Sequence, residues 1–467
     1  MNGKTLLPAV LVLVAAGCNS ILDVKPINEI SEQAAITSPA GARAALAGMY
    51  DGLQSTGYYG GTFVFFGDLS GDDVRHTGTF TTYRLADNNQ LTADNTTIQG
   101  LWDAMYRVVG RANVLIARVP TLSSTDPTWP PERDEIMGEA YFVRALTFHN
   151  VQTLWGEQAP SGRGVPIPLV PVSDIPSSAQ ITRATTGAVY TQILSDLAKA
   201  ESLMTVSGAS PGATHGNIGA VHAIRSRVYL FQQNWAGAEA EAQSVAAMGY
   251  ALDADYGAML NDGYSSEAVF VLDFTAVDFQ LLGYYYRAKG AAGGRREIGP
   301  TTSFIQQYSP GYVAGNPATF VTTDLRGQHD IKFQGTILPY TVYGAKWETG
   351  IGGEDYHVIR FAEVLLNEAE AEAQQGKLVE AEASLLPIRT RAGLAAARVD
   401  TMTQANAIAT ILQERRLELA FEGHRWPDLV RTGRAVAVMG IPAFQQLYPI
   451  PLQEIDVAPG LEQNTGY

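Results

Sequence analysis

The side chains that could perform catalysis are scattered along this 467-residue chain. His149 falls within an apolar helical pattern, where a histidine usually belongs to the core. Asp68, Asp72 and Asp73 are close in sequence, but their spacing does not match a calcium-binding loop, so we interpret them as a solvated turn. The sequence has no HExxH, P-loop or GxSxG motif and no cysteine–histidine cluster. We therefore expect no catalytic centre, no metal site and no cofactor.

Cys18 is the only cysteine in the sequence, so no intramolecular disulfide can form. It follows one basic residue, an apolar run from Leu6 to Val14 and three small residues. This arrangement is typical of a secretion signal and is much shorter than the roughly 20 apolar residues of a membrane span. A cysteine at the end of such a signal resembles the bacterial lipobox, in which the thiol is acylated. We therefore predict a signal peptide over residues 1–17, lipidation at Cys18 and a lipid-anchored tether over residues 18–28.

The overall charge disfavours nucleic acid as a partner. The chain has 32 Lys and Arg residues against 47 Asp and Glu residues, which gives a formal net charge of −15. Binding to nucleic acid depends on clustered basic side chains that neutralise phosphates. No low-complexity tract or block of like charges occurs, so we expect a folded chain beyond the tether.

Apolar residues recur with helical spacing along most of the chain. In the first such block, Ala42, Ala45, Leu46 and Met49 fall on one face. The predicted helices are Pro39 to Gln54, Leu101 to Val119, Gly138 to Trp155, Val189 to Met204, Ile218 to Gln232, Ala236 to Ala247, His357 to Gln375, Leu378 to Arg391 and Gln404 to Glu422. Residues 251–346 are irregular, with a short strand-like run from Val269 to Phe274. The sequence therefore predicts a mainly α fold with long irregular loops and a few short strands.

Two segments of the chain can be aligned with each other. Gln232 to Ala240 aligns with Gln375 to Ala383, and in each a helix ends at glutamine, a short turn follows and an alanine-rich helix begins. Small alanine side chains let helices approach closely, as in stacked tetratricopeptide-like hairpins. We therefore predict that one kind of helical hairpin is used twice in a tetratricopeptide-like scaffold.

Five segments, in this order along the chain, resemble the SusD/RagB family of outer-membrane lipoproteins. They are LWDAMYRVVGRANVLIARV (Leu101 to Val119), GEAYFVRALTFHNVQTLWG (Gly138 to Gly156), GEDYHVIRFAEVLLNEAEA (Gly353 to Ala371), ERRLELAFEGHRWPDLVRTG (Glu414 to Gly433) and LYPIPLQEIDVAPGLEQNTGY (Leu447 to Tyr467). Together they span nearly the whole mature chain. The tail departs from the family pattern, because Ala458 precedes Pro459 and Thr465 stands where a second proline is common.

Two of these segments also have a plain packing interpretation. Between Val358 and Ala371 the apolar residues form one stripe, and we expect Glu363, Asn367 and Glu370 to face away from it. Arg425 and Asp428 have the i, i+3 spacing of a helical ion pair. These motifs are therefore expected to build the scaffold. The proline-containing tail is expected to run extended over the body.

The resemblance implies a SusD-like scaffold with an N-terminal part over residues 29–250 and a C-terminal part over residues 251–467, packed as one body. It implies a non-catalytic protein, lipid-anchored in the outer membrane, that delivers oligosaccharides to a SusC-like TonB-dependent transporter. Capture of peptides, as in RagB-like members, is the main alternative. Two further alternatives remain. One is a glycosidase, which needs only two carboxylates at a suitable distance. The other is a structural helical-repeat adaptor that binds another protein.

A glycan site needs exposed aromatic rings beside polar groups, because a sugar ring has an apolar face and a rim of hydroxyls. Most aromatic residues fill cores, but those in loops on a rigid scaffold are better candidates. The predicted ligand-binding residues are Tyr83, Asn89, Tyr284, Tyr286 and Trp347. We expect the run of three tyrosines at 284–286 to be extended, so that at most two of them share a face.

Overall fold

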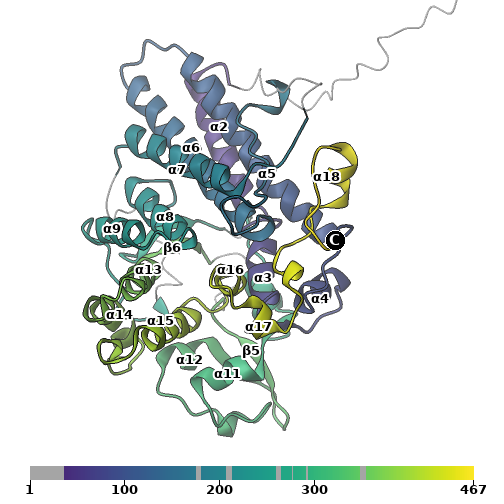
Figure 1. Cartoon of the computed structure of the whole chain (residues 1–467), viewed down its shortest axis with the longest axis vertical. Coiled ribbons are helices and arrows are strands. Elements are labelled where there is room, and N and C mark those ends of the chain that lie inside the picture. The colour runs from purple at the N-terminus through teal and green to yellow at the C-terminus, as the bar shows by residue number, and fades with distance from the viewer. Residues whose placement is uncertain are drawn as a thin grey trace, which may run out of the picture.

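Helices make up most of the molecule, as the sequence predicts (Figure 1). The computed structural model describes residues 36–174, 180–206, 213–258, 265–275, 277–290, 293–347 and 354–467. The predicted signal peptide, Cys18 and the tether lie outside these residues. None of the described helices is both long enough and apolar enough to cross a membrane.

The N-terminal part contains four long helices and two short ones. The long helices are α2 (Pro39–Gln54), α5 (Thr96–Arg118), α6 (Trp129–Trp155) and α7 (Thr186–Leu203), and the short ones are α3 (Thr62–Leu69) and α4 (Thr81–Asp87). The side chain of Ser38 caps α2 and that of Asn95 caps α5, each by accepting hydrogen bonds from backbone N–H groups of the first turn. Helix α6 packs against α2, α5 and α7, which buries almost every residue from Gly138 onward.

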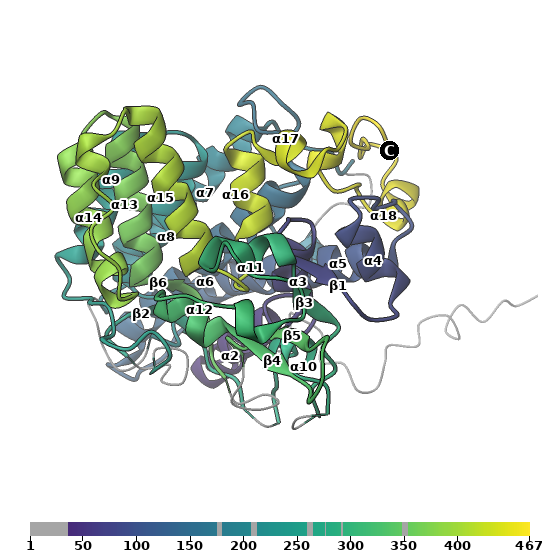
Figure 2. The same cartoon turned by 90° about the horizontal axis from the view of Figure 1, so that it is seen from below.

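The other helices include stacked helical hairpins and shorter helices in the C-terminal segment. The hairpins are formed by α8 (Ile218–Phe231), α9 (Trp235–Ala246), α13 (Phe361–Gln374), α14 (Leu378–Arg391) and α15 (Gln404–Glu418), and the shorter helices are α16 (Arg425–Arg431), α17 (Ala435–Met439) and α18 (Leu452–Val457). Helix α8 packs against α9, and α13 packs against both α14 and α9, so that neighbouring hairpins stack (Figure 2). Both predicted hairpins are confirmed. Their aligned turn residues, Gln233 and Gly376, have left-handed φ angles of 58° and 78°.

Short strands join distant parts of the chain in antiparallel pairs. Within the described ranges, β1 (Val74–His76) pairs with β3 (Ile298–Pro300), β2 (Ala268–Leu272) with β6 (Tyr356–Arg360), and β4 (Ile331–Gln334) with β5 (Thr341–Gly344). The remaining short elements are α10 (Leu282–Tyr286), α11 (Thr302–Tyr308), α12 (Leu325–Asp330) and the 3-10 turns η2 (Val119–Thr121), η3 (Val172–Asp174), η6 (Pro317–Thr319), η7 (Val399–Thr401) and η8 (Ala443–Gln446).

The predicted start of one helix is wrong for a tertiary reason. The helix predicted from His357 begins at Phe361, because residues 357–360 belong to the fully buried strand β6. Pairing with β2, which is far away in sequence, outweighs the local helical pattern, and the β-branched Val358 and Ile359 suit a strand. The tail also departs from the prediction, since it contains the short helix α18.

The polar face of α13 is buried, contrary to the expectation that it faces away from the packing. Glu363, Asn367 and Glu370 are each at most 1% exposed. Arg227 of α8 donates to both carboxylate oxygens of Glu363 at 2.7 and 2.6 Å, and Arg431 of α16 donates to both oxygens of Glu370 at 2.7 and 2.8 Å. The helix therefore packs on two sides, one apolar and one held by charge-assisted hydrogen bonds.

A second group of buried charges surrounds Arg360, at the end of β6. The Arg360 guanidinium donates to Glu267 at 2.8 Å, to Glu418 at 2.6 Å and to Glu422 at 2.8 Å. Burial alone would raise the pKa of Glu418, but the charges of Arg391, Arg360 and Arg326 hold that pKa at about 2. This group joins β2, β6 and α15 in the interior.

The aspartates at 68, 72 and 73 are not a solvated turn. Asp72 and Asp73 form ion pairs with Arg416 and Arg425, which fixes the α3–β1 turn to α15 and α16. Asp68 is 1% exposed and accepts hydrogen bonds from the backbone N–H of Gly423 and a tyrosine hydroxyl. The predicted Arg425–Asp428 pair is also wrong, since Asp428 instead accepts from Arg415 and Arg431.

Replacing Arg360 with methionine should destabilise the protein strongly. The variant leaves three carboxylates buried without their shared cation, and breaking a buried pair in this way costs about 3–5 kcal/mol. The matched control is Arg398→Met, because the Arg398 side chain is 63% exposed and, within the described ranges, forms an ion pair only with Asp400. The control should change the free energy of unfolding by less than about 1 kcal/mol. Urea unfolding measures both, and equal losses would contradict the central role of Arg360.

Acid should weaken the fold through Glu418. Its pKa is about 2 in the folded protein and about 4.3 in an unfolded chain. A lowered folded pKa gives stability that is fully present above the unfolded pKa and is lost as the pH falls through the folded pKa. We expect the free energy of unfolding to fall between about pH 5 and pH 2. Glu418→Gln should be less stable at pH 7 and show a shallower decline, whereas an unchanged slope would contradict this assignment.

Candidate functional site

An aromatic cluster brings together two segments that are far apart in sequence. It consists of Phe65 of α3, Phe80 and Tyr83 at the start of α4, and Tyr284 and Tyr285 of α10. Neighbouring ring centroids are 4.8 to 5.7 Å apart in the Phe65–Tyr285, Phe80–Tyr83, Tyr83–Tyr285 and Tyr284–Tyr285 pairs. These distances are favourable for aromatic packing.

Backbone pairing places the two segments against each other. The β1–β3 ladder aligns His76 with Ile298, and the N–H of Thr77 extends it by donating to the carbonyl of Glu297 at 2.7 Å. On its other side, the N–H of Glu297 donates to the carbonyl of Tyr285 at 2.8 Å. Residues 295–297 therefore lie between α4 and α10. The cluster depends on this arrangement, because neither short helix could hold its rings in place alone.

A cation lies over two rings of the aromatic cluster. The guanidinium carbon of Arg295 lies 5.3 Å from the ring centre of Phe80 and 5.6 Å from that of Tyr284. Arg295 also forms an ion pair with Glu297. Phe80 is 39% exposed, Tyr284 is partly exposed, and the Arg295 side chain is 39% exposed. The surface thus offers two rings and hydrogen-bond donors in one place.

Polar groups beneath the rings are less completely paired. Within the described part of the chain, one carboxylate oxygen of Glu297 and both ring nitrogens of His76 have no hydrogen-bond partner. Burial raises the pKa of Glu297, while Arg295 opposes the shift, and burial lowers the pKa of His76. A β-carbon at Gly78 would lie 2.7 Å from Glu297 Cγ, so the absence of a side chain there lets Glu297 approach the strand.

The structure brings together two of the five predicted ligand-binding residues. Tyr83 and Tyr284 both belong to the aromatic cluster, although Tyr83 is only 8% exposed. Asn89 is 6% exposed and takes a left-handed φ of 54° in the turn after α4. Ligand contact at these positions stays a prediction.

Tyr286 and Trp347 lie in the core, so the expectation that they are exposed loop residues is wrong. Tyr286 is fully buried and donates its hydroxyl to Asp68 at 2.5 Å, and Trp347 is 1% exposed and donates to the carbonyl of Phe421 at 2.9 Å. The tyrosine run forms the helix α10 rather than an extended stretch, which directs its three side chains differently. Ligand contact at these two positions stays a prediction.

Sequence reasoning missed four contributors to the aromatic cluster: Phe65, Phe80, Tyr285 and Arg295. Phe80 and Tyr285 are next to or near predicted residues, so aromatic density within a loop was the available signal. Arg295 offered no such signal. It belongs to the cluster because its guanidinium lies over two rings from different segments of the chain.

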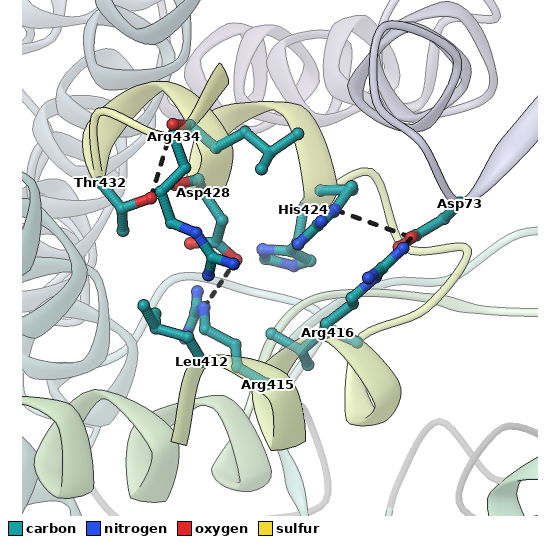
Figure 3. Close-up of a pocket in the computed structure, with 11 residues that line it drawn as sticks. Asp73, Leu412, Arg415, Arg416, His424, Asp428, Thr432 and Arg434 are labelled. Carbon is teal, nitrogen blue, oxygen red and sulfur yellow. Dashed lines mark hydrogen bonds and ion pairs between the residues drawn. The ribbon is translucent and has the colours of Figure 1, made fainter. Parts of the chain in front are cut away.

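The polar cavity between α15 and α16 is a different kind of feature (Figure 3). It is lined by Arg415, Arg416, His424 and Asp428, and its volume is about 10 Å³, which is the size of a single water site. In Figure 3 Arg415 points toward Asp428 and Arg416 toward Asp73, in keeping with their hydrogen bonds. The cavity belongs to the buried charge network. No group of three or more potential metal ligands occurs among the described residues.

Comparison with known proteins identifies relatives along the whole chain. A family model described as "SusD family" matches residues 337–446, and one described as "Starch-binding associating with outer membrane" matches residues 21–230. SusD-like protein P38 of Formosa agariphila is 27% identical over 98% of this chain and 98% of its own length. SusD-like protein P2 of the same organism is 24% identical over 92% of this chain and 91% of its own length.

Solved structures show the same fold. A SusD superfamily protein from Bacteroides thetaiotaomicron superposes with a TM-score of 0.77 at 24% identity, over 92% of this chain and 100% of that one. A laminarin-binding SusD-like protein superposes with a TM-score of 0.77 at 23% identity, over 92% of this chain and 100% of that one. The two family models together match well over half of the sequence. The family expected from the five sequence segments is thereby confirmed, and the chain belongs to the SusD/RagB family.

Proposed function

We propose that this protein captures an oligosaccharide on the aromatic cluster and delivers it, without chemical change, to a SusC-like TonB-dependent transporter in the outer membrane. The observation that carries the proposal is the pair of exposed rings, Phe80 and Tyr284, with Arg295 lying over both. Aromatic rings can hold the C–H face of a sugar, and a guanidinium with five N–H donors can bind its hydroxyls.

The comparisons support a glycan rather than a peptide as the ligand. One matching family model is described as starch-binding and associated with the outer membrane, and one structural neighbour is named for binding laminarin. The acidic charge of the chain argues against polyanionic ligands. Capture of peptides is the alternative outcome of a binding screen.

Removing both exposed rings of the aromatic cluster should abolish most glycan affinity. For the Phe80→Ala/Tyr284→Ala double variant we expect at least a tenfold rise in Kd, about 1.4 kcal/mol or more, because aromatic residues commonly dominate binding energy. Calorimetry with laminarin-derived and starch-derived oligosaccharides measures this change. The matched control is Tyr141→Ala, which removes a partly buried ring of α6 outside the cluster.

Circular dichroism should show both of these variants folded. If the double variant binds as tightly as the wild type, the aromatic cluster is not the glycan site. If members of a peptide library bind and no glycan does, the proposal that the ligand is an oligosaccharide is wrong.

The anchor and the transporter can be tested in one purification. Extraction from the native host in mild detergent should yield protein with a lipid-modified Cys18, together with a TonB-dependent barrel. Two or more acyl chains give the stable membrane attachment that such a complex requires. A Cys18→Ser variant should be released into the soluble fraction. Mass spectrometry of the N-terminal peptide reads the modification, and an unmodified Cys18 or a preparation without a barrel would contradict the respective part of the proposal.

A further inference from the structure

A groove follows one face of α2, outside the aromatic cluster. Seven residues of α2 line it, one of which is Gly52. The other six have spacings of 3, 4, 7, 8 and 11 from the first, which places them on one helical face: Arg43, Leu46, Ala47, Tyr50, Asp51 and Gln54. At 1.5 Å per residue this face is about 16 Å long. The groove consists of two adjoining hollows of about 310 and 480 Å³ that share Gln54.

The opposite wall of this α2 groove is the segment that follows β2. It contributes Asp273 and residues 277–279, together with Leu272 at the end of β2, and the groove is also lined by His215, Arg107 and Arg111. The amide nitrogen of Gln54 crosses between the walls and donates to the carbonyl of Asp273 at 2.5 Å. The groove is therefore bounded by two segments that a hydrogen bond holds at a fixed separation.

Charges in the α2 groove are balanced. Three arginines and three aspartates line it: Arg43, Arg107, Arg111, Asp51, Asp273 and Asp278. Arg111 pairs with Asp51 at 3.2 Å, and Arg43 pairs with Glu132. The side chains of Arg107 and Asp278 make no hydrogen bond or ion pair with any residue in the described ranges. A carboxylate and a guanidinium that are both available suit the hydroxyl groups of a polar, uncharged ligand.

Apolar and aromatic surface is also exposed along the α2 groove. Phe279 is 41% exposed and Val277 is 92% exposed. The side chain of His215 is 55% exposed, and its ring centre lies 4.7 Å from that of Tyr50. Exposed rings beside unpaired polar groups repeat the chemistry of the aromatic cluster.

The chain connects the α2 groove directly to the aromatic cluster. Phe279 comes shortly before α10, which carries Tyr284. Between them, the N–H of Leu281 donates to the carbonyl of Gly60 at 2.7 Å, which fixes this connection on the body of the protein. Phe279 of the groove and Tyr284 of the cluster therefore belong to one segment of the chain, although Gln280 and Leu282 between them are buried.

We propose that the α2 groove binds the continuation of a neutral oligosaccharide whose first rings lie on the aromatic cluster. The inference rests on the proposed function and adds a second binding segment and a ligand class. Equal numbers of arginines and aspartates give no preference for a charged chain, and the net charge of −15 repels polyanions. Affinity should consequently rise with the length of the oligosaccharide.

The test compares short and long neutral oligosaccharides. Calorimetry uses a series of laminarin and starch oligosaccharides from disaccharides upward, and uronic-acid oligomers of similar length as the charged comparison. For Arg107→Ala/Phe279→Ala we expect about tenfold weaker binding of the longest neutral oligomers and unchanged binding of the shortest ones. The matched control is Lys199→Ala/Val321→Ala, which removes an exposed cation and an apolar side chain that is 75% exposed, both outside the groove.

The possible outcomes separate this inference from the proposed function. Suppose that the groove variant binds long oligomers as the wild type does, while Phe80→Ala/Tyr284→Ala binds none. Glycan binding in the groove is then contradicted, and glycan capture by the aromatic cluster is supported. If the groove variant instead loses only the transporter in a pull-down, the groove is a protein contact and the glycan inference is overturned. If uronic-acid oligomers bind more tightly than neutral oligomers of similar length, the inference that the ligand is neutral is contradicted. If the wild type binds no oligosaccharide, both proposals fail.

Discussion

The fold depends on charges that are buried among its helices and must meet one another. Arg360 joins three glutamates at the centre, and Arg227 and Arg431 hold the polar face of α13. An ion pair inside a protein gives little net stability, but an unpaired buried charge is costly. The network therefore chiefly disfavours incorrect packing of the helices, because any shift of one hairpin along another would separate several ion pairs at once. Apolar side chains alone would tolerate such shifts more easily.

The same network reaches the candidate site. Asp72 and Asp73 end the segment after α3, and their pairs with Arg416 and Arg425 fix where β1 begins. Strand β1 then pairs with β3, and the two bring α4 against α10. The exposed rings thus rest on elements that are short and weak in themselves but are held at their ends by the rigid helical body. This is the usual way in which loops on a scaffold acquire a defined geometry.

Local sequence patterns predicted the helix boundaries that depend on neighbouring residues alone. The limits of α2 and α14 agree with the prediction at both ends, because caps, glycine turns and helical periodicity are read over a few residues. The predictions are wrong where contacts with residues far away in sequence determine the local structure. Residues 357–360 form a strand because β2 lies beside them, and Glu363 is buried because Arg227 of another hairpin meets it. For the candidate site, the sequence identified Tyr83 and Tyr284 by their type and setting, but their proximity to Phe80 and Arg295 exists only in three dimensions.

The pairing of β1 with β3 also determines when the aromatic cluster can form during folding. Strand β3 ends at Pro300, so more than 220 residues separate the two strands of the ladder. Closing so long a loop is slow and entropically costly, and it follows the formation of the local helices. A chain that has been synthesised only as far as β1 and α4 lacks the α10 rings and has no complete aromatic cluster. The cluster is therefore complete only after all of the chain up to β3 has folded.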